Sequence, residues 1–175
     1  EIFVPVTPPP VWAPVTKPLN EMVIALATAA GVHRKEDKRF NLAGDFTWRE
    51  IYDSTPSSDL MVSHGGYDNS DVNKDINCMF PIDRLHELAK EGFIKGVAPV
   101  HIGFMGGGGN VEKFRNETGP EIAKKLKAQG VDIVLCTGGC GTCHRSATIV
   151  TRCCEAEGMS CCVIAALPPI DRNSL

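Results

Sequence analysis

The sequence predicts an α/β protein with a doubly wound, mostly parallel sheet of the Rossmann- or flavodoxin-like type. Apolar segments with strand character alternate with amphipathic, helix-like segments through the second half of the chain. Glycine-rich turns follow two of the apolar segments, at 106–109 and 138–141. Alternation of this kind favours a parallel sheet, in which the carboxyl ends of the strands form the ligand crevice.

Composition narrows the class of protein. The 175 residues carry a net charge of −3 with both signs interspersed, which argues against a nucleic-acid partner or a polybasic membrane contact. The apolar runs are shorter than the roughly 20 residues of a membrane span. Seven of the eight cysteines lie between positions 136 and 162, two pairs of them adjacent, and no signal peptide is visible. This pattern favours a reducing, cytoplasmic location over a secreted disulfide scaffold.

The chain divides into an extended Pro-rich arm at 1–20 and a single α/β catalytic domain at 21–175. Prolines are too frequent in the arm for a helix or a central strand. The arm either packs along the domain surface or reaches a second subunit, because its Val, Trp and Phe side chains favour burial.

The first half of the domain predicts three strands. Residues 22–28 form a buried strand that leads into a strand-end loop at 29–33, 45–51 alternate as a short edge strand does, and 60–64 form another short strand. The following stretch, 65–75, is rich in turn formers and carboxylates, and is either a plain polar loop or a loop that borders the active site.

The second half predicts three helices and three strands. The first helix has Pro81 near its start and Gly92 at its end, and Gly130 ends the second. The predicted elements in order are a helix at 80–92, a strand at 97–104, a helix at 118–130, a strand at 131–135, a helix at 142–157 and a strand at 160–167.

Parallel strands bring their carboxyl ends to one edge, so segments 28–33, 101–110 and 136–145 should converge. Consecutive glycines at 106–109 permit close backbone approach, but they lack the Lys-Ser/Thr of a nucleotide-binding loop. The residues at these strand ends that we predict to bind substrate are His33, His101, Gly107 and Gly108. His64 also lies at a predicted strand end.

The predicted site centres on the segment 131–146. An apolar run enters a glycine-rich turn, and the turn carries Cys140-Gly-Thr-Cys143 into a helix. Exposed N–H groups at a helix N-terminus favour an anion, so the pKa of Cys140 should be lowered. We therefore predict nucleophilic or redox thiol chemistry at Cys140, with Cys143 as the resolving thiol.

Other interpretations of this loop fit less well. The Cys136-x3-Cys140-x2-Cys143 spacing equals that of a radical iron–sulfur motif, but it spans a strand end and a helix start. A zinc site with His144 would lack a second ligand knuckle, and we predict no metal. A phosphatase-type loop needs five residues between Cys and Arg, whereas Cys140 and Arg145 enclose four. A thioredoxin-like disulfide oxidoreductase and a non-enzymatic metal-binding or scaffold protein remain the alternatives.

Five segments carry a resemblance to a known family: 4–12, 63–68, 80–85, 104–109 and 139–146. They resemble the selenoprotein B family of the glycine, sarcosine, betaine and D-proline reductases, and among these they look like the selenoprotein subunit of D-proline reductase. The last, Gly-Cys-Gly-Thr-Cys-His-Arg-Ser, is the most specific. The family carries selenocysteine where this sequence has Cys140.

The resemblance implies reductive ring opening of D-proline to 5-aminopentanoate in a hetero-oligomer. A pyruvoyl group on a partner subunit activates the substrate as an iminium, Cys140 attacks the α-carbon, and Cys143 then displaces the product. An external dithiol or electron-transfer protein reduces the resulting disulfide, and this chain itself binds no cofactor. His144 is a candidate proton donor and Arg145 a candidate ligand of the substrate carboxylate.

Overall fold

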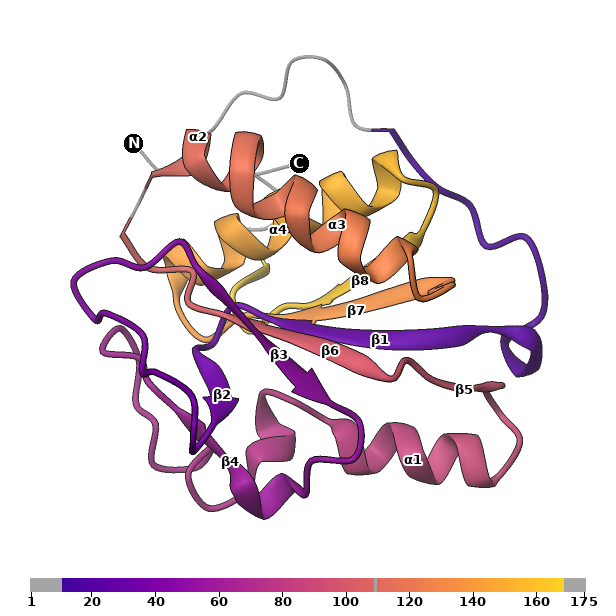
Figure 1. The fold of residues 1–175 in the computed structure, drawn as a ribbon, viewed down its shortest axis with the longest axis horizontal. Coiled ribbons are helices and arrows are strands. Elements are labelled where there is room, and N and C mark those ends of the chain that lie inside the picture. Colours follow the sequence, from indigo (N-terminus) through magenta and orange to yellow (C-terminus); the bar gives the residue numbers. More distant parts are fainter. Residues whose placement is uncertain (1–10, 109, 169–175) are drawn as a thin grey trace.

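The computed structural model describes residues 11–108 and 110–168, and a six-stranded sheet lies at its centre (Figure 1). Its main strand order is β3 (Trp48–Tyr52), β6 (Val100–Phe104), β1 (Val23–Thr28), β7 (Ile133–Thr137) and β8 (Ser160–Ile164), and β5 (Gly96–Val97) also pairs with β1. Only β3 runs antiparallel to its neighbour. The predicted α/β fold with a mostly parallel sheet is confirmed, whereas its Rossmann- or flavodoxin-like character stays a prediction.

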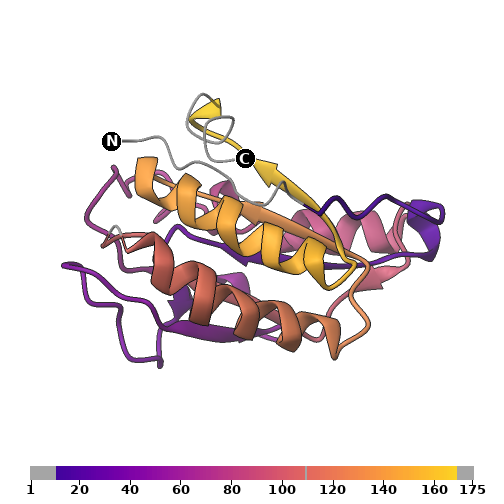
Figure 2. The same ribbon diagram turned by 90° about the horizontal axis from the view of Figure 1, so that it is seen from above.

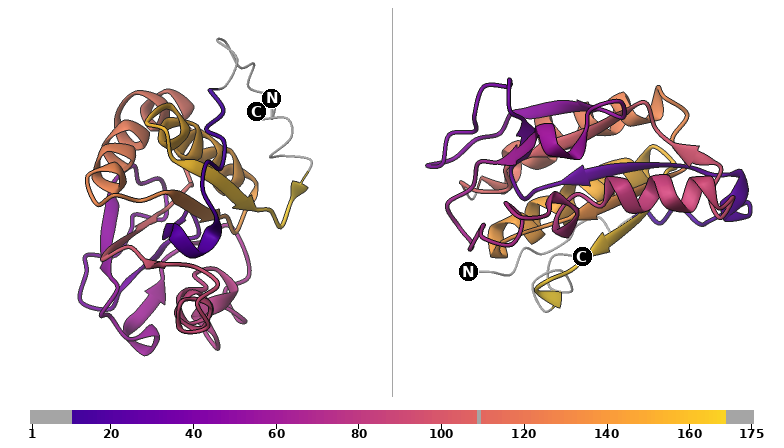
Figure 3. Two further views of the ribbon diagram at one scale, coloured as in Figure 1. Left: turned by 90° about the vertical axis from the view of Figure 1, so that its right-hand side faces the viewer. Right: turned by 90° about the horizontal axis from the view of Figure 1, so that it is seen from below.

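Helices cover both faces of the sheet. Above it in Figure 1 lie α2 (Val111–Lys113), α3 (Gly119–Lys127) and α4 (Gly141–Ala156), and below it lies α1 (Ile82–Lys90). The view from above shows α3 and α4 side by side, and the end-on view shows the sheet between these helices and α1 (Figures 2 and 3). The three main helices and all the predicted strands are present, with ends shifted by a few residues.

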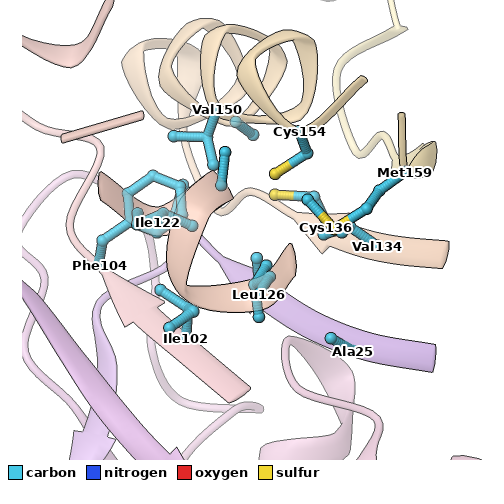
Figure 4. Packing of buried hydrophobic residues seen from close by; sticks show 14 of the residues in the cluster. Ala25, Ile102, Phe104, Ile122, Leu126, Val134, Cys136, Val150, Cys154 and Met159 are labelled. Carbon is cyan, nitrogen blue, oxygen red and sulfur yellow. The ribbon is translucent and has the colours of Figure 1, made fainter. Parts of the chain in front are cut away.

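The central strand β1 explains this layering. Its side chains alternate between the two faces: Ala25 and Ala27 pack with α3 and α4, and Ile24 and Leu26 pack on the α1 side. The small alanines allow close approach of the α3–α4 layer, whose core is shown in Figure 4. A strand apolar on both faces is typical of a central parallel strand.

Two predicted boundaries are wrong in an informative way. Residues 29–33 are not only a loop, because Val32–Arg34 forms β2, which pairs with β4 (Leu60–Val62) in a separate two-stranded antiparallel sheet. The predicted strand at 97–104 is interrupted before Val100, since Pro99 has no backbone N–H for the sheet. Residues 114–118 form one wide helical turn that joins α2 to α3, which the sequence did not suggest.

The predicted arm falls partly outside the described residues, which begin at position 11. Residues 11–18 form neither helix nor strand, and Leu19–Glu21 forms a single 3-10 turn before β1. Trp12 is 77% exposed. Among the described residues, no helix has both the length and the apolar character needed to cross a membrane.

Candidate active site

Cys140 occupies the N-cap position of α4. Its backbone is extended, with φ −137°, and its sulfur accepts a hydrogen bond from the backbone N–H of Cys143 at 3.3 Å. The strand β7 ends at Thr137, so only Gly138 and Gly139 separate the sheet from the N-cap residue Cys140. The predicted placement of Cys140 at a helix N-terminus is therefore present in the structure.

Cys140 and Cys143 form a close pair of thiols. Their Sγ atoms lie 2.8 Å apart, and the Thr142 hydroxyl lies 3.2 Å from the Cys140 sulfur. The hydrogen bond from the Cys143 thiol is the main reason why the pKa of Cys140 lies far below its ordinary value. The same hydrogen bond, together with complete burial, raises the pKa of Cys143. The pair is thus a thiolate on Cys140 beside a protonated Cys143.

His64 completes this arrangement from the loop that follows β4. Its Nε2 lies 2.9 Å from the Cys143 sulfur and 3.7 Å from the Cys140 sulfur. The backbone N–H of Gly66 donates to Nδ1 at 2.8 Å, so Nδ1 carries no proton and Nε2 is the protonated nitrogen. A chain of hydrogen bonds follows, from His64 Nε2–H to the Cys143 sulfur and from the Cys143 thiol to the Cys140 thiolate.

Tyr67 packs over the same loop. Its ring lies 5.0 Å from the ring of His64, and its hydroxyl donates to the carbonyl oxygen of Ala30 at 2.9 Å. A Cβ atom at Gly139 would overlap the Tyr67 ring, so the absence of a side chain there lets the two segments pack. Residues 64–67 therefore border the active site, which was the second of the two predictions for this stretch.

Three strand ends converge on the dithiol, as predicted. Ala29 after β1 donates to Thr137 O at 2.9 Å, and Gly106 after β6 donates to Ala29 O at 3.0 Å. A Cβ at Gly106 would lie 2.5 Å from the Cα of Cys143. The close backbone approach expected of the glycine run thus occurs at Gly106.

The other predicted glycines lie further along this loop. A Cβ at Gly107 would meet only the Met105 side chain, whereas Gly108 has φ +101° and packs against Gly44. None of these contacts joins Gly107 or Gly108 to the sulfur atoms, and substrate binding by them stays a prediction.

His144 is completely buried, and both of its ring nitrogens hold the backbone. A carbonyl oxygen can only accept, so Nδ1–H donates to Cys140 O at 2.6 Å. Nε2 accepts from the backbone N–H groups of Ala166 and Leu167 at 3.0 and 3.2 Å. The structure therefore brings His144 to the backbone of Cys140 rather than to its sulfur.

His33 is the middle residue of β2 and His101 is the second residue of β6, so neither lies at the carboxyl end of its strand as predicted. His33 donates from Nδ1 to Arg34 O at 2.7 Å and accepts from the Ser63 hydroxyl at 2.8 Å, and burial lowers its pKa. His101 accepts from the N–H of Leu26 at 3.0 Å and faces Asp53 with Nε2 at 3.4 Å. His33 thus supports the residue before His64, and His101 ties β6 to β1.

Arg145 follows the dithiol in the first half of α4. Its Nε is buried and lacks a hydrogen-bond partner among the described residues. A buried guanidinium nitrogen without a partner is costly, unless a ligand supplies an acceptor. Carboxylate binding by Arg145 stays a prediction.

Two other cysteines belong to the hydrophobic core. Cys136 and Cys154 are buried in the core beneath α4, where Figure 4 shows their side chains pointing toward each other. In the structure both act as small core residues that fill the space between β7 and α4.

One group in the described residues has the donor atoms of a soft metal site: His64, Cys140 and Cys143, whose ligand atoms lie within 4.8 Å of one another. A metal-bound histidine normally donates its other N–H to an acceptor. In His64 the other nitrogen instead accepts from Gly66 N–H. The hydrogen bonding of His64 therefore favours a hydrogen bond from Nε2–H to sulfur over metal binding.

The sequence pointed to His64 as a strand-end residue but did not place it among the predicted site residues. The missed signal was the segment Ser63-His64-Gly65-Gly66-Tyr67, in which a histidine directly follows a strand and two glycines follow the histidine. Its proximity to Cys143, 79 positions further along, depends on the β2–β4 pairing, which the sequence did not reveal.

A thiolate at a helix N-terminus beside a buried partner thiol is typical of proteins that use a reactive dithiol. The sequence model of the Glycine/sarcosine/betaine reductase selenoprotein B family matches residues 4–139. The chain belongs to this family.

The chain spans about three quarters of the length of one relative and less than half of the length of others. "D-proline reductase subunit gamma" of Acetoanaerobium sticklandii is 66% identical over 174 residues, covering 99% of this chain and 72% of that protein. "Glycine reductase complex component B subunit gamma" of Carboxydothermus hydrogenoformans is 31% identical, covering 91% of this chain and 38% of that protein. "Sarcosine reductase complex component B subunit beta" of Peptoclostridium acidaminophilum is 30% identical, covering 90% and 37%. No solved structure matches the chain at a significant level.

Proposed function

We propose that this chain is a subunit of a reductase complex that opens the ring of D-proline to give 5-aminopentanoate. One observation carries the proposal: the sulfur of Cys140, at the N-terminus of α4, lies 2.8 Å from the sulfur of the buried Cys143. The lowered pKa of Cys140 and the raised pKa of Cys143 favour a thiolate on Cys140 beside a protonated Cys143. The 66% identity to a protein named as a D-proline reductase subunit supports the choice of substrate.

The nucleophile in this reaction is the Cys140 sulfur. Three hydrogen bonds hold it as a thiolate, and its half-buried position leaves it open to a substrate from outside the chain. A pyruvoyl group on a partner subunit, when present, makes the substrate α-carbon electrophilic. Cys140 would attack that carbon as the ring C–N bond breaks, the bonding electron pair would stay on the ring nitrogen, and hydrolysis would later free this nitrogen as the amine.

Cys143 then completes the reduction. Its sulfur attacks Cys140, forming the disulfide and releasing the product carbon, which takes a proton. An external dithiol or electron-transfer protein returns the disulfide to two thiols. The two electrons that reduce the C–N bond thus come from the thiol pair, and no cofactor bound by this chain is required.

Two further residues have roles in the proposal. Arg145 binds the substrate carboxylate through its guanidinium, whose buried Nε has no hydrogen-bond partner among the described residues. His144 is a positioning residue in place of the proton donor we expected, because its Nδ1–H holds Cys140 O. His33, His101, Gly107 and Gly108 are retained as candidate contributors to the substrate side of the site. The complex is a cytoplasmic hetero-oligomer in this proposal.

The test is reconstitution. The chain, mixed with a pyruvoyl-bearing partner subunit, D-proline and dithiothreitol, should yield 5-aminopentanoate, and the chain alone should yield none. The variants Cys140→Ser and Cys143→Ser should be inactive in the mixture. Folded subunits that give no product from D-proline would overturn the assignment.

The thioredoxin-like alternative is favoured by one feature, the Cys-x-x-Cys pair at a helix N-terminus. It requires reduction of protein disulfides by this chain alone. Insulin reduction with dithiothreitol as the electron source distinguishes the two, and we expect a rate no higher than that of dithiothreitol by itself.

A further inference from the structure

We propose that His64 is a fixed N–H donor to Cys143, and that it stabilises the Cys143 thiolate in the step in which Cys143 attacks the modified sulfur of Cys140. The role rests on the proposed function for its natural substrate. It applies equally to any compound that becomes covalently attached to Cys140, so it can be tested without D-proline.

The surroundings of His64 fix the position of its proton. Gly66 N–H points at Nδ1 from 2.8 Å, and an amide N–H cannot accept a hydrogen bond. The ring is 6% exposed and packs against Tyr67. Its backbone carbonyl accepts from the Asn69 side chain at 2.7 Å, which anchors the loop. Nε2–H therefore has one direction available, toward the two sulfur atoms.

The resolving step needs such a donor. While Cys140 is a free thiolate, it accepts a hydrogen bond from the Cys143 thiol, and this hydrogen bond keeps Cys143 neutral. Once Cys140 is covalently modified this acceptor is lost, and Cys143 must ionise in a site with no solvent exposure. A buried anion without donors is strongly disfavoured. The backbone N–H groups of Gly139 and Cys140 favour the anion, and His64 Nε2, 2.9 Å from the Cys143 sulfur, adds a side-chain donor that is already in place.

The bonds and charges balance without a change in the protonation of His64. The Cys143 thiol releases its proton to solvent, its thiolate attacks the Cys140 sulfur, and the Sγ–Sγ bond forms. The bond from Cys140 to the attached group breaks, and its electron pair leaves with that group. The dithiol is oxidised and the attached group is reduced.

This role differs from that of a general base. A base would have to take the Cys143 proton on Nε2, which already carries one. Protonation of Nδ1 would break the hydrogen bond from Gly66. The titratable groups that face the ring are Tyr67, Cys140 and Cys143. A side chain that has an N–H donor but cannot act as a base should therefore be able to take over the role of His64.

The experiment uses 5,5′-dithiobis(2-nitrobenzoate), which attaches to Cys140 with release of one thionitrobenzoate. Attack by Cys143 releases a second. Both phases are measured at neutral pH in a Cys78→Ser, Cys162→Ser background, which removes the exposed thiols. His64→Leu should slow the second phase by about 10- to 100-fold, as expected for loss of one hydrogen bond to a charged group, and affect the first phase less.

Two variants and one spectrum complete the test. His64→Gln, which retains an N–H donor, should resolve at a rate near that of wild type, and the exposed His86→Leu should change neither phase. An unchanged second phase in His64→Leu, or equal slowing in His64→Gln, would overturn the proposal.

The nitrogen-15 spectrum of the histidine rings tests the same assignment without a substitution. His64 should show the Nε2–H form, and His33 and His144 should show the Nδ1–H form as internal controls. An Nδ1–H form of His64 would contradict the inference even if the variants fail to fold.

Discussion

The Nδ1–H of His144 lies 2.6 Å from the carbonyl oxygen of Cys140, so the nucleophile and a buried residue one helical turn further along are joined through the backbone. The same ring accepts N–H groups from Ala166 and Leu167, beyond the end of β8. His144 therefore connects the helix N-cap to the segment that follows the edge strand. A change in this ring should alter the fold around Cys140 rather than remove a catalytic group.

We predict that His144→Ala lowers the free energy of unfolding by about 3 kcal/mol, since it leaves a cavity and removes the side-chain acceptor of the Ala166 and Leu167 N–H groups. Urea unfolding measures this loss. His86→Ala is the matched control, because the His86 side chain is 43% exposed and should cost less than about 1 kcal/mol. A stable His144→Ala protein with full loss of D-proline turnover would instead favour the proton-donor role.

We predict that Gly106→Ala destabilises the active site. The added Cβ would lie 2.5 Å from the Cα of Cys143, and neither backbone segment can move without shifting α4 or the sheet. The expected cost is about 1–3 kcal/mol, with slower alkylation of Cys140. Gly65→Ala is the control in the neighbouring loop, because no atom lies within 4 Å of its added Cβ. Equal stability of the two variants would contradict the close approach.

The lowered pKa of Cys140 predicts a pH-dependent stability of the reduced protein. A thiol whose pKa is lower in the folded chain stabilises the fold when ionised, and this contribution falls as the pH falls toward the folded pKa. Between about pH 5 and pH 8, below the ordinary thiol pKa of about 8.5, the free energy of unfolding should rise with pH relative to that of Cys140→Ser. Denaturant titrations at several pH values measure the difference. Parallel curves for the two proteins would show that Cys140 is not a stabilised thiolate.

Arg145 offers a test of substrate binding that is separate from stability. Replacing it with Met keeps much of its volume and removes a buried nitrogen without a partner, so the free energy of unfolding should stay constant or increase. The KM for D-proline in the reconstituted complex should rise about 10- to 100-fold, because a charge-assisted contact to the carboxylate is lost. Arg84→Met on α1, where Arg84 pairs with Glu87 at the surface, is the control. An unchanged KM would remove Arg145 from the substrate site.

Most elements of the main sheet could be predicted because local patterns fix them. The two-faced apolar character of β1, the proline and glycine at the ends of α1, and the glycine turn before α4 are short-range signals. The strand β2 escaped prediction since three residues offer too few positions for alternation to show, and β4 was predicted without its partner. Pairing partners are set by tertiary packing, which one sequence pattern does not contain.

The site divides in the same way. Cys140 and Cys143 were identified because they lie three positions apart at the start of one helix, so the local sequence alone brings their side chains close together. His64 comes from a distant loop, and its role depends on which ring nitrogen faces Gly66. His144 was a candidate proton donor, and its hydrogen bonds to the backbone escaped prediction for a related reason. Spacing along a helix gives the side of the helix on which a residue lies, but not the hydrogen bonds that its ring forms after folding.

Selenium at position 140 gives the last prediction. The usual advantage of a selenol is that it is ionised at neutral pH, but hydrogen bonds already hold the Cys140 sulfur as a thiolate. A low thiol pKa also reduces intrinsic nucleophilicity, so ionisation alone does not make the sulfur form efficient. We expect selenium to raise D-proline turnover by about tenfold or more, mainly because the bond from selenium to carbon breaks more readily when Cys143 attacks.

The test compares the turnover rates of the selenium and sulfur forms up to about pH 9, above the ordinary thiol pKa. If selenium acted through ionisation, its advantage would disappear at high pH. An advantage that persists there would assign it to the resolving step, in which Cys143 and His64 act.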